Sequence, residues 1–442
     1  MDYDELLERS RALPYEIPTR ANRLSELRAR AREVEEHAAG VRPVLHGEVV
    51  PLIRAFLEIK RELGSPAEQA VYAGLDEVGF VSRLLSKRPL AFLNAFDRYL
   101  LRDGTSGIGG FELVGGRYER HPLTLADLLS YDEVAISALL GVSVPTHFIN
   151  AGSRNNRAVP GEPGSFEPRG IYVGLVGARF EKPERMEWQH VRVTPEQNTP
   201  AKGYGPDADP AAPATRLSRA WAAFYGREHL PSYAEAAADS SGRYLPLGDG
   251  LFDTELYTHR IRASVEVFLR EADRRAAAAG QRAYAHAVGL GLGVWQIHPR
   301  QLGLTMEVYA DVLREVALPH LADVDFSWIG GVNACGRVRD GETFASGPNQ
   351  VRIHFSQRDP AAPLRGADAG KLLVAMYAWD ANAFPGNEYW LGSLSASGDP
   401  AAACCSNLPE LQNPDVNPRV SGPHALTFGP AGACVPLGTG GG

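Results

Sequence analysis

Cysteine is scarce in this chain, and its spacing carries no metal or disulfide signature. Only four of the 442 residues are cysteines, at positions 335, 404, 405 and 434, and no two of them form a C-x-x-C pair. This scarcity excludes a small disulfide-stapled secreted fold and is typical of a reduced intracellular protein. We therefore expect a cytoplasmic protein, with export as an effector left open.

Long hydrophobic runs and an excess of basic residues are missing as well. No stretch approaches the ~20 apolar residues that cross a bilayer, and the first residues, MDYDELLERS, lack the basic-then-apolar pattern of a signal peptide. The 45 Lys and Arg residues are outnumbered by 53 Asp and Glu residues, so the formal net charge is −8. Nucleic-acid surfaces need clustered excess Lys and Arg. We expect no membrane or nucleic-acid partner, and a monomer.

Several common catalytic and nucleotide-binding motifs are absent. The chain has no G-x-x-x-x-G-K-[ST] phosphate loop and no H-E-x-x-H zinc motif. Gly289, Gly291 and Gly293 form G-x-G-x-G, but Val294 stands where the dinucleotide fingerprint needs its third glycine. A P-loop enzyme is therefore excluded and a Rossmann dehydrogenase is disfavoured. We expect that neither a metal nor a cofactor is required.

The most informative stretch runs from Lys371 to Trp390, KLLVAMYAWDANAFPGNEYW. Its apolar run Leu372–Tyr377 shows no alternation, which predicts a strand buried on both faces of a parallel sheet. Asp380, Asn382 and Glu388 follow at once, among turn residues. Ligands bind outside the carboxyl ends of parallel strands, so this composition favours a ligand site. A surface turn of the same composition is the alternative interpretation.

A second stretch, Tyr284–Trp295, is another short apolar segment and runs into the three glycines of YAHAVGLGLGVW. A helical pattern at about Leu304–Val316 and a strand pattern at Val324–Ile329 follow it. Strand, glycine loop, helix and strand together predict a βαβ unit. Its loop can bring backbone N–H groups against phosphate oxygens.

The remaining patterns predict an α/β fold with three parts. Residues 1–145 are expected to form a helical accessory domain, residues 146–428 the ligand-binding α/β domain, and residues 429–442 a flexible glycine-rich tail. Further strands are predicted at Ile171–Phe180, Trp188–Val193 and Val351–Phe355, and a long helix at Leu251–Ala279. Helices in the first part are predicted at Asn22–Ala39, Pro51–Leu63, Pro66 to about Lys87, from Pro89 onward, and at Leu123–Leu140.

Three segments resemble the macrodomain family. AMYAWDANAFPGNEYW is similar to its strand that ends in two amides before a glycine-rich loop, and SQRDP is similar to the turn whose Asp reads adenine. AHAVGLGLGVWQ resembles its second phosphate loop. In an ordinary macrodomain the adenine Asp comes first, but here the loop at Gly289 precedes Asp359, as in a circular permutation. The resemblance implies a macrodomain-like three-layer α/β/α sheet with an N-terminal helical domain.

The MavL-type branch of ADP-ribosyl hydrolases, related to poly(ADP-ribose) glycohydrolases, is the most similar group. This resemblance implies removal of ADP-ribose from arginine on a modified protein, ubiquitin included, by acidic residues. Carried over, the catalytic positions are Glu388, Asp380 and Asp399, although Asp399 also fits a helix N-cap. The chain departs from the glycohydrolase pattern because it lacks a triple glycine and has one Glu in place of two. A non-catalytic ADP-ribose reader and a poly(ADP-ribose) glycohydrolase are the alternatives.

The ligand-binding residues implied by the resemblance lie in the same three segments, with ADP-ribose as ligand and product. They are Asp359, Gln357, Asn382, Gly386, Asn387, Gly289, Gly291, Gly293, Val294, Trp295 and Phe326. The aromatic residues among them would stack on adenine or shape the ribose pocket, and each fits a core position equally well. Two carboxylates around one ribose would serve an oxocarbenium-like transition state.

Overall fold

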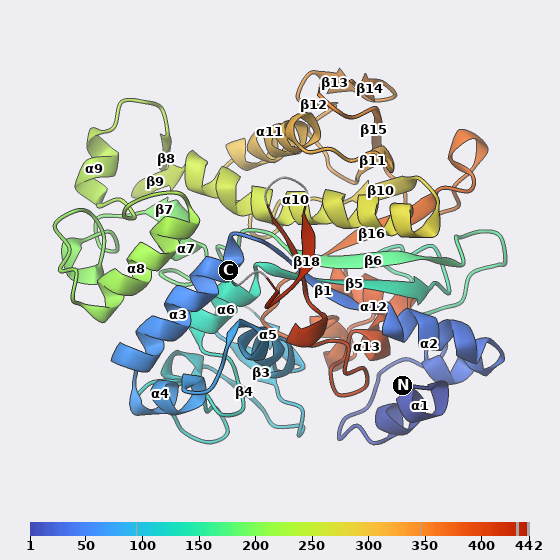
Figure 1. The fold of residues 1–442 in the computed structure, drawn as a ribbon, viewed down its shortest axis with the longest axis horizontal. Helices are drawn as coiled ribbons and strands as arrows, with labels where there is room; N and C mark the ends of the chain where they lie inside the picture. Colours follow the sequence, from blue (N-terminus) through green and yellow to red (C-terminus); the bar gives the residue numbers. More distant parts are fainter. Residues whose placement is uncertain (94, 346, 430–432, 440–442) are drawn as a thin grey trace.

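A ten-stranded mixed sheet runs through the molecule (Figure 1). This computed structural model describes residues 1–93, 95–345, 347–429 and 433–439. The strand order is β14-β15-β11-β10-β16-β6-β5-β1-β17-β18. The strands are β1 (Arg42–His46), β5 (Leu140–His147), β6 (Arg169–Val176), β10 (Ala283–Ala287), β11 (Leu321–Ser327), β14 (Thr343–Phe344), β15 (Val351–Ser356), β16 (Leu372–Trp379), β17 (Leu426–Phe428) and β18 (Cys434–Pro436).

Five neighbouring strands, β15, β11, β10, β16 and β6, are all parallel to one another. β16 is central among them, with Val374 opposite both Ala285 of β10 and Ile171 of β6. The apolar run predicted at the start of β16 is confirmed as a strand, because a strand with neighbours on both edges and helices on both faces loses contact with water. The predicted βαβ unit is confirmed as β10, α11 (Arg300–Glu315) and β11.

Helices cover both faces of the sheet (Figure 1). On one face lie α11 and the long α10 (Thr254–Ala279), which contacts β1, β6, β10, β11 and β16. The Asp253 carboxylate caps α10 by accepting the N–H groups of Glu255 and Leu256, both at 3.1 Å. Gly280, at φ 64°, ends it. The opposite face carries α2 (Ala31–Ala39), α12 (Asp399–Cys405) and α13 (Leu408–Leu411).

The first 145 residues are not purely helical, which corrects that expectation. Strand β1 lies inside the ten-stranded sheet, antiparallel to β5 and parallel to β17. The segment after Pro89 forms a small sheet of β2 (Ala91–Leu93), β3 (Arg98–Leu100) and β4 (Ser106–Ile108). The helices here are α1 (Tyr3–Arg11), α2, α3 (Val49–Leu63), α4 (Pro66–Tyr72), α5 (Glu77–Ser86) and α6 (Tyr131–Ser137), with a 3-10 segment at Leu24–Arg30. Strands this short depend on distant partners, which local patterns do not reveal.

The middle and the end of the chain bring two further corrections. The strand predicted at Trp188–Val193 is a helical turn, α7 (Trp188–Val191), followed by β7 (Arg192–Val193). In the expected flexible tail, β18 pairs with β17, while residues 430–432 and 440–442 lie outside the described residues. The other elements are α8 (Pro213–Phe224), α9 (Tyr233–Ala238), β8 (Tyr244–Leu247), β9 (Gly250–Asp253), β12 (Ala334–Cys335) and β13 (Val338–Arg339).

Whether residue 145 divides the chain into separate folding units stays a prediction. The sheet itself is continuous across that position, since β1 and β5 both belong to it. Within the described part of the chain, no helix combines the length and the hydropathy that a bilayer crossing requires.

Candidate active site

The carboxyl ends of the five parallel strands meet along one edge of the sheet. Asp380 follows β16 directly, and the segment Gly177–Arg179 follows β6. The loop after β10 reaches the same edge, because a Cβ atom on Gly291 would lie 2.9 Å from the backbone oxygen of Ala178. Trp328 follows β11, and Gln357 follows β15. Segments more than 150 residues apart in the sequence, such as those after β6 and β16, thus lie side by side.

Asp380, Glu388 and Asp399 form a cluster of three carboxyl groups, in which Glu388 adds to the raised pKa values of both aspartates. Burial and then the Glu388 carboxylate raise the pKa of Asp380 to about 7. Burial, followed by the charges of Asp380 and Glu388, raises the pKa of Asp399 well above its usual range. Burial also raises the pKa of Glu388. Buried like charges disfavour further ionisation, so this trio holds protons near neutral pH.

Hydrogen bonds divide the trio into two tethered acids and one free acid. Asp380 accepts the backbone N–H of Asn382 at 2.9 Å and the side-chain amide of Asn387. Asp399 accepts the backbone N–H of Gly386 at 2.8 Å. The partly exposed Glu388 carboxylate makes no side-chain hydrogen bond to any other residue that the structure describes. Glu388 is therefore the acid whose carboxylate is available to a ligand.

Asn382 is oriented by a residue that the sequence interpretation missed, Arg179. The Arg179 guanidinium donates to Asn382 Oδ1 at 2.7 Å and to the backbone oxygen of Asp380 at 3.0 Å. Because an arginine can only donate, the oxygen of the Asn382 amide must face it, and the NH₂ group points elsewhere. The strand predicted at Ile171–Phe180 includes Arg179, whereas β6 ends at Val176, so the overlong predicted strand hides this residue.

Arg179 is itself held by a buried ion pair. Glu187 accepts Arg179 Nε at 3.0 Å and Arg260 Nε at 2.8 Å, and its side chain is 4% exposed. Burial would raise the pKa of Glu187, but the two guanidinium groups hold it at about 2. We call Glu187, Arg179 and Arg260 the compensated group, and it is a rigid structural support next to the acidic trio.

The glycine loop after β10 has a packed part and an open part. Gly291, at φ 68°, lies against the backbone of Gly177 and Ala178, where no side chain fits. A Cβ atom on Gly293 would meet nothing within 4 Å, and Val294 is 95% exposed. Among the predicted loop residues, Gly289 and Trp295 are half-buried at its two ends. The open tip is the part that can approach a ligand.

Asp359 lies at the other end of α12 from Asp399. It raises the pKa of Cys405, the last residue of that helix, after the larger effect of burial. Burial raises the pKa of Asp359 itself. Six residue steps along a helix span roughly 9 Å, so the predicted adenine-reading acid and the acidic trio are separated along one helix. Gln357 is exposed beside Asp359.

Two residues predicted to bind ligand lie in the interior, which corrects their assignment. The Phe326 ring is 0% exposed and packs between Tyr309 and Phe355, at centroid distances of 4.8 and 5.1 Å. Asn387 is 4% exposed, and its amide bonds the backbone of Phe92 and the Asp380 carboxylate. Alternation along β11 puts Phe326 on the helix-covered face, and loop closure consumes the Asn387 amide.

Trp328 is the aromatic side chain that this edge of the sheet exposes instead. It follows β11 directly, has φ 59° and is 61% exposed. Its indole N–H donates to the backbone oxygen of Arg358 at 3.1 Å, next to Asp359. The strand predicted at Val324–Ile329 includes Trp328, whereas β11 ends at Ser327, so the sequence pattern hides the exposed position of this ring.

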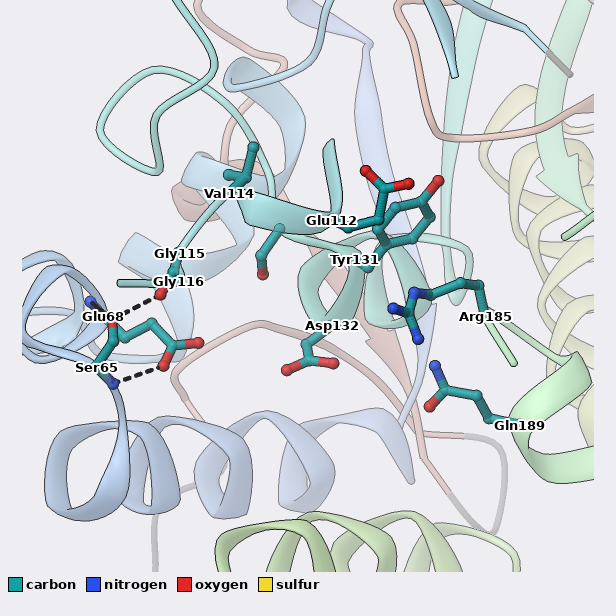
Figure 2. A pocket seen from close by; sticks show the side chains of 11 residues that line it. Ser65, Glu68, Glu112, Val114, Gly115, Gly116, Tyr131, Asp132, Arg185 and Gln189 are labelled. Atoms are coloured by element: carbon teal, nitrogen blue, oxygen red, sulfur yellow. Dashed lines mark hydrogen bonds between the residues drawn. The ribbon is translucent and has the colours of Figure 1, made fainter. Parts of the chain in front are cut away.

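The structure also has a separate hollow of about 330 Å³, whose lining side chains are drawn in Figure 2. Glu112, Tyr131, Asp132 and Arg185 line it, and none of the three clustered acids does. Lys182 donates to Glu112 Oε1 and to the Tyr131 hydroxyl, both at 3.0 Å. The hollow is therefore polar, and Lys182 forms a salt bridge with its Glu112, whereas none of the three clustered acids forms a salt bridge in the described part of the chain.

An α/β protein with a tethered pair of acids and one free acid at the ends of parallel strands has the groups of a hydrolytic enzyme. The family model described as ADP-ribosylhydrolase MavL-like matches residues 4–429. Two proteins of Drosophila melanogaster are similar: ADP-ribosylarginine hydrolase CG3568 is 40% identical over 399 residues, which are 88% of this chain and 78% of the relative. ADP-ribosylarginine hydrolase CG2909 is 37% identical over 404 residues, 88% and 79% of the two chains. This chain belongs to the MavL-like ADP-ribosylhydrolase family.

Proposed function

We propose that this protein hydrolyses the bond between ADP-ribose and an arginine side chain of a modified protein. Both relatives carry the name ADP-ribosylarginine hydrolase, and the family model covers almost the whole chain. The observation that carries the proposal is the free, partly exposed Glu388 carboxylate beside two tethered acids. A glycosidic bond needs this combination, because its cleavage builds positive charge on the sugar ring.

We infer that ADP-ribose lies along α12, with adenine near Asp359 and the reacting ribose near Glu388. The free NH₂ group of Asn382 faces away from Arg179 and serves as a donor to a ribose hydroxyl. The open tip of the glycine loop at Gly293 supplies backbone N–H groups for the pyrophosphate. This assignment corresponds to a macrodomain-like arrangement in circularly permuted order. In it Trp328, and not Phe326, is the aromatic side chain available to the ligand.

In the proposed reaction, Glu388 removes a proton from a water molecule that attacks the anomeric carbon. The bond from that carbon to the guanidine nitrogen breaks, a bond to the water oxygen forms, and the leaving guanidine takes up the proton that Glu388 accepted from the water. The negative charge of Glu388 also stabilises the oxocarbenium-like transition state. Water is the only co-reactant, so we propose that neither a metal nor a cofactor takes part.

Asp380 and Asp399 act through the loop in this proposal. Each accepts a backbone N–H, of Asn382 and Gly386 respectively, and so fixes the turn that carries Glu388. Their raised pKa values keep the two aspartates protonated, so that Glu388 is the member of the trio that carries the negative charge. Asp399 is the first residue of α12, but the N-cap is Gly398 and no side chain caps the helix, so the cap interpretation is wrong and the Asp399 carboxylate reaches the Gly386 loop instead.

The test is release of ADP-ribose from protein acceptors modified on arginine, serine or glutamate, with ADP-ribosylated ubiquitin among the arginine-linked substrates. We expect release from the arginine linkage and much slower release from the other two. Calorimetry with free ADP-ribose is run in parallel. Binding without release from any linkage would replace the proposal with a non-catalytic reader, and release from poly(ADP-ribose) alone would replace it with a chain glycohydrolase.

A further inference from the structure

We propose that Glu33, His37 and His147 form a structural site for a divalent transition metal, Zn²⁺ above all. The three residues lie away from the acidic trio, where α2 packs on β5. One ligand atom from each lies within 4.8 Å of the other two. His₂Glu is a donor set that Zn²⁺ uses, with a fourth position left for water.

The local fold brings the three side chains together. Glu33 and His37 are four residues apart on α2, so they share one face of the helix. His147 is the last residue of β5, and its imidazole ring centroid lies 4.7 Å from that of His37. His147 Nε2 lies 3.4 Å from Glu33 Oε2. Two elements far apart in sequence thus point two nitrogens and one carboxylate oxygen at a common position.

One nitrogen of each histidine makes no hydrogen bond in the described structure, although that of His147 faces the Glu33 carboxylate. Nδ1 of His37 and Nε2 of His147 are buried without a hydrogen-bond partner, and His147 is 1% exposed. A buried polar atom without a partner carries a cost of about 1–3 kcal/mol. A metal ion would satisfy both nitrogens together, which a single water molecule could do only by bridging them.

Outer contacts orient two of the ligands. Arg169 Nε holds Glu33 Oε1 at 2.5 Å and leaves Oε2 turned toward the histidines. Arg30 lies 3.3 Å from Nδ1 of His147, on the ring edge away from Glu33. Such second contacts fix the orientation of metal ligands and tune affinity. The two cationic groups, Arg169 and Arg30, weaken cation binding relative to a site surrounded by acids. With only one oxygen ligand, the site suits Zn²⁺ better than Mg²⁺ or Ca²⁺, which prefer several oxygen ligands.

The metal would connect the N-terminal segment to the helix that carries Asp399. The His147 backbone N–H donates to Asn407 Oδ1 at 3.3 Å, and Asn407 donates to the backbone oxygen of Asn22 at 2.7 Å. Asn22 in turn bonds the backbone oxygen of Ala403 in α12 at 2.5 Å. We therefore expect Zn²⁺ to stabilise the fold without entering the reaction.

The test uses the full chain after chelator treatment, titrated with ZnCl₂ by calorimetry and with Co²⁺ by visible absorption. We expect one Zn²⁺ per chain, a Co²⁺ spectrum of a mixed N/O site, and a higher unfolding temperature with Zn²⁺. His37→Gln and Glu33→Gln should each weaken Zn²⁺ binding by more than the ~10- to 100-fold that loss of an outer contact costs. Both substituted residues are only half-buried, and circular dichroism checks that the variants fold.

The matched control is His259→Gln, which removes a histidine that lies 3.1 Å from Glu48 in a different His/Glu cluster. We expect this variant to bind Zn²⁺ and Co²⁺ as the parent does. Absence of Zn²⁺ uptake by the folded parent would overturn the proposal. So would uptake that survives both His37→Gln and Glu33→Gln, or that is lost only in His259→Gln.

Discussion

Two groups of charges lie at the ends of neighbouring strands β16 and β6, and their pKa values shift in opposite directions. Burial and then the neighbouring carboxylates raise the pKa values of Asp380 and Asp399, that of Asp380 to about 7. Burial would raise the pKa of Glu187 too, but its ion pairs with Arg179 and Arg260 lower that pKa to about 2. Two bonded guanidinium groups outweigh desolvation at Glu187, whereas the one guanidinium group that acts on Asp380, that of Arg179, does not outweigh it there.

The difference separates a group that supports a reaction from a group that supports the fold. Compensated charges are fully ionised and fixed, whereas uncompensated acids keep protons that can be exchanged near neutral pH. Arg179 joins the two groups, because the same guanidinium binds Glu187 and orients Asn382. A single residue, Arg179, thus connects the structural ion pair to Asn382, the predicted ligand contact. Each group can still be altered by its own substitution.

The largest expected effect comes from Glu388→Gln. The amide keeps the shape of the side chain but cannot accept a proton from water or carry charge, so we expect turnover of an arginine-linked substrate to fall ~100- to 10,000-fold. Affinity for ADP-ribose by calorimetry should stay within a few-fold. Glu112→Gln, at an exposed acid outside the trio, is the control. Full activity of Glu388→Gln together with an inactive Asp399→Asn would move the essential acid to α12.

The compensated group is broken by Glu187→Gln. Two buried guanidinium groups would lose their counter-charge, which typically costs roughly 3–5 kcal/mol of unfolding free energy. Urea unfolding measures this loss, and Glu196→Gln at an exposed position should cost almost nothing. A small loss of unfolding free energy for Glu187→Gln would contradict the stabilising role that we give to this ion pair.

The packing of the glycine loop against Gly177 and Ala178 is tested by comparing Gly291→Ala with Gly293→Ala. A Cβ atom on Gly291 would lie 2.9 Å from the Ala178 oxygen, in a backbone conformation that costs a non-glycine residue about 1–2 kcal/mol. We expect Gly291→Ala to weaken ADP-ribose binding several-fold and to lower stability. Gly293→Ala, which meets nothing within 4 Å, should fold normally. Equal effects of the two substitutions would contradict the packed and open parts of the loop.

The smallest expected effect is the pH dependence of stability. The pKa of Asp380 is raised from 3.8 to about 7 on folding, so the native state binds more protons than the unfolded state between these values. Its stabilising protonation is lost as the pH rises through 7, and unfolding free energy should fall from pH 5 to pH 8. Asp380→Asn should flatten that fall, as urea unfolding at both pH values would show. Glu187, whose pKa is lowered on folding, makes stability depend on pH only below pH 4.5. Its stabilising contribution is complete above that value and is lost as the pH falls below it.

Local sequence patterns predicted the elements that can be recognised without knowing which segments they pair with or pack against. β16 and β10 are apolar runs that stop at turn residues, and α10 has apolar residues at helical spacing between a carboxylate cap and Gly280. β1 was missed, because five residues after a helix have no signal of their own. It is a strand only because β5 and β17 pair with it.

The sequence by itself determined that polar residues crowd the ends of buried strands, and with them the residue types available for chemistry: Asp380, Asn382, Glu388 and Asp359. Only the tertiary structure decided how these residues divide their work. Asn387 and Glu388 are adjacent in the chain, yet one amide is consumed by Phe92 and Asp380 while the next carboxylate stays free. The partners that fix Asn387 and Asn382, Phe92 and Arg179, come from segments about 200 to 300 residues away, and spacing along a chain does not contain those distances.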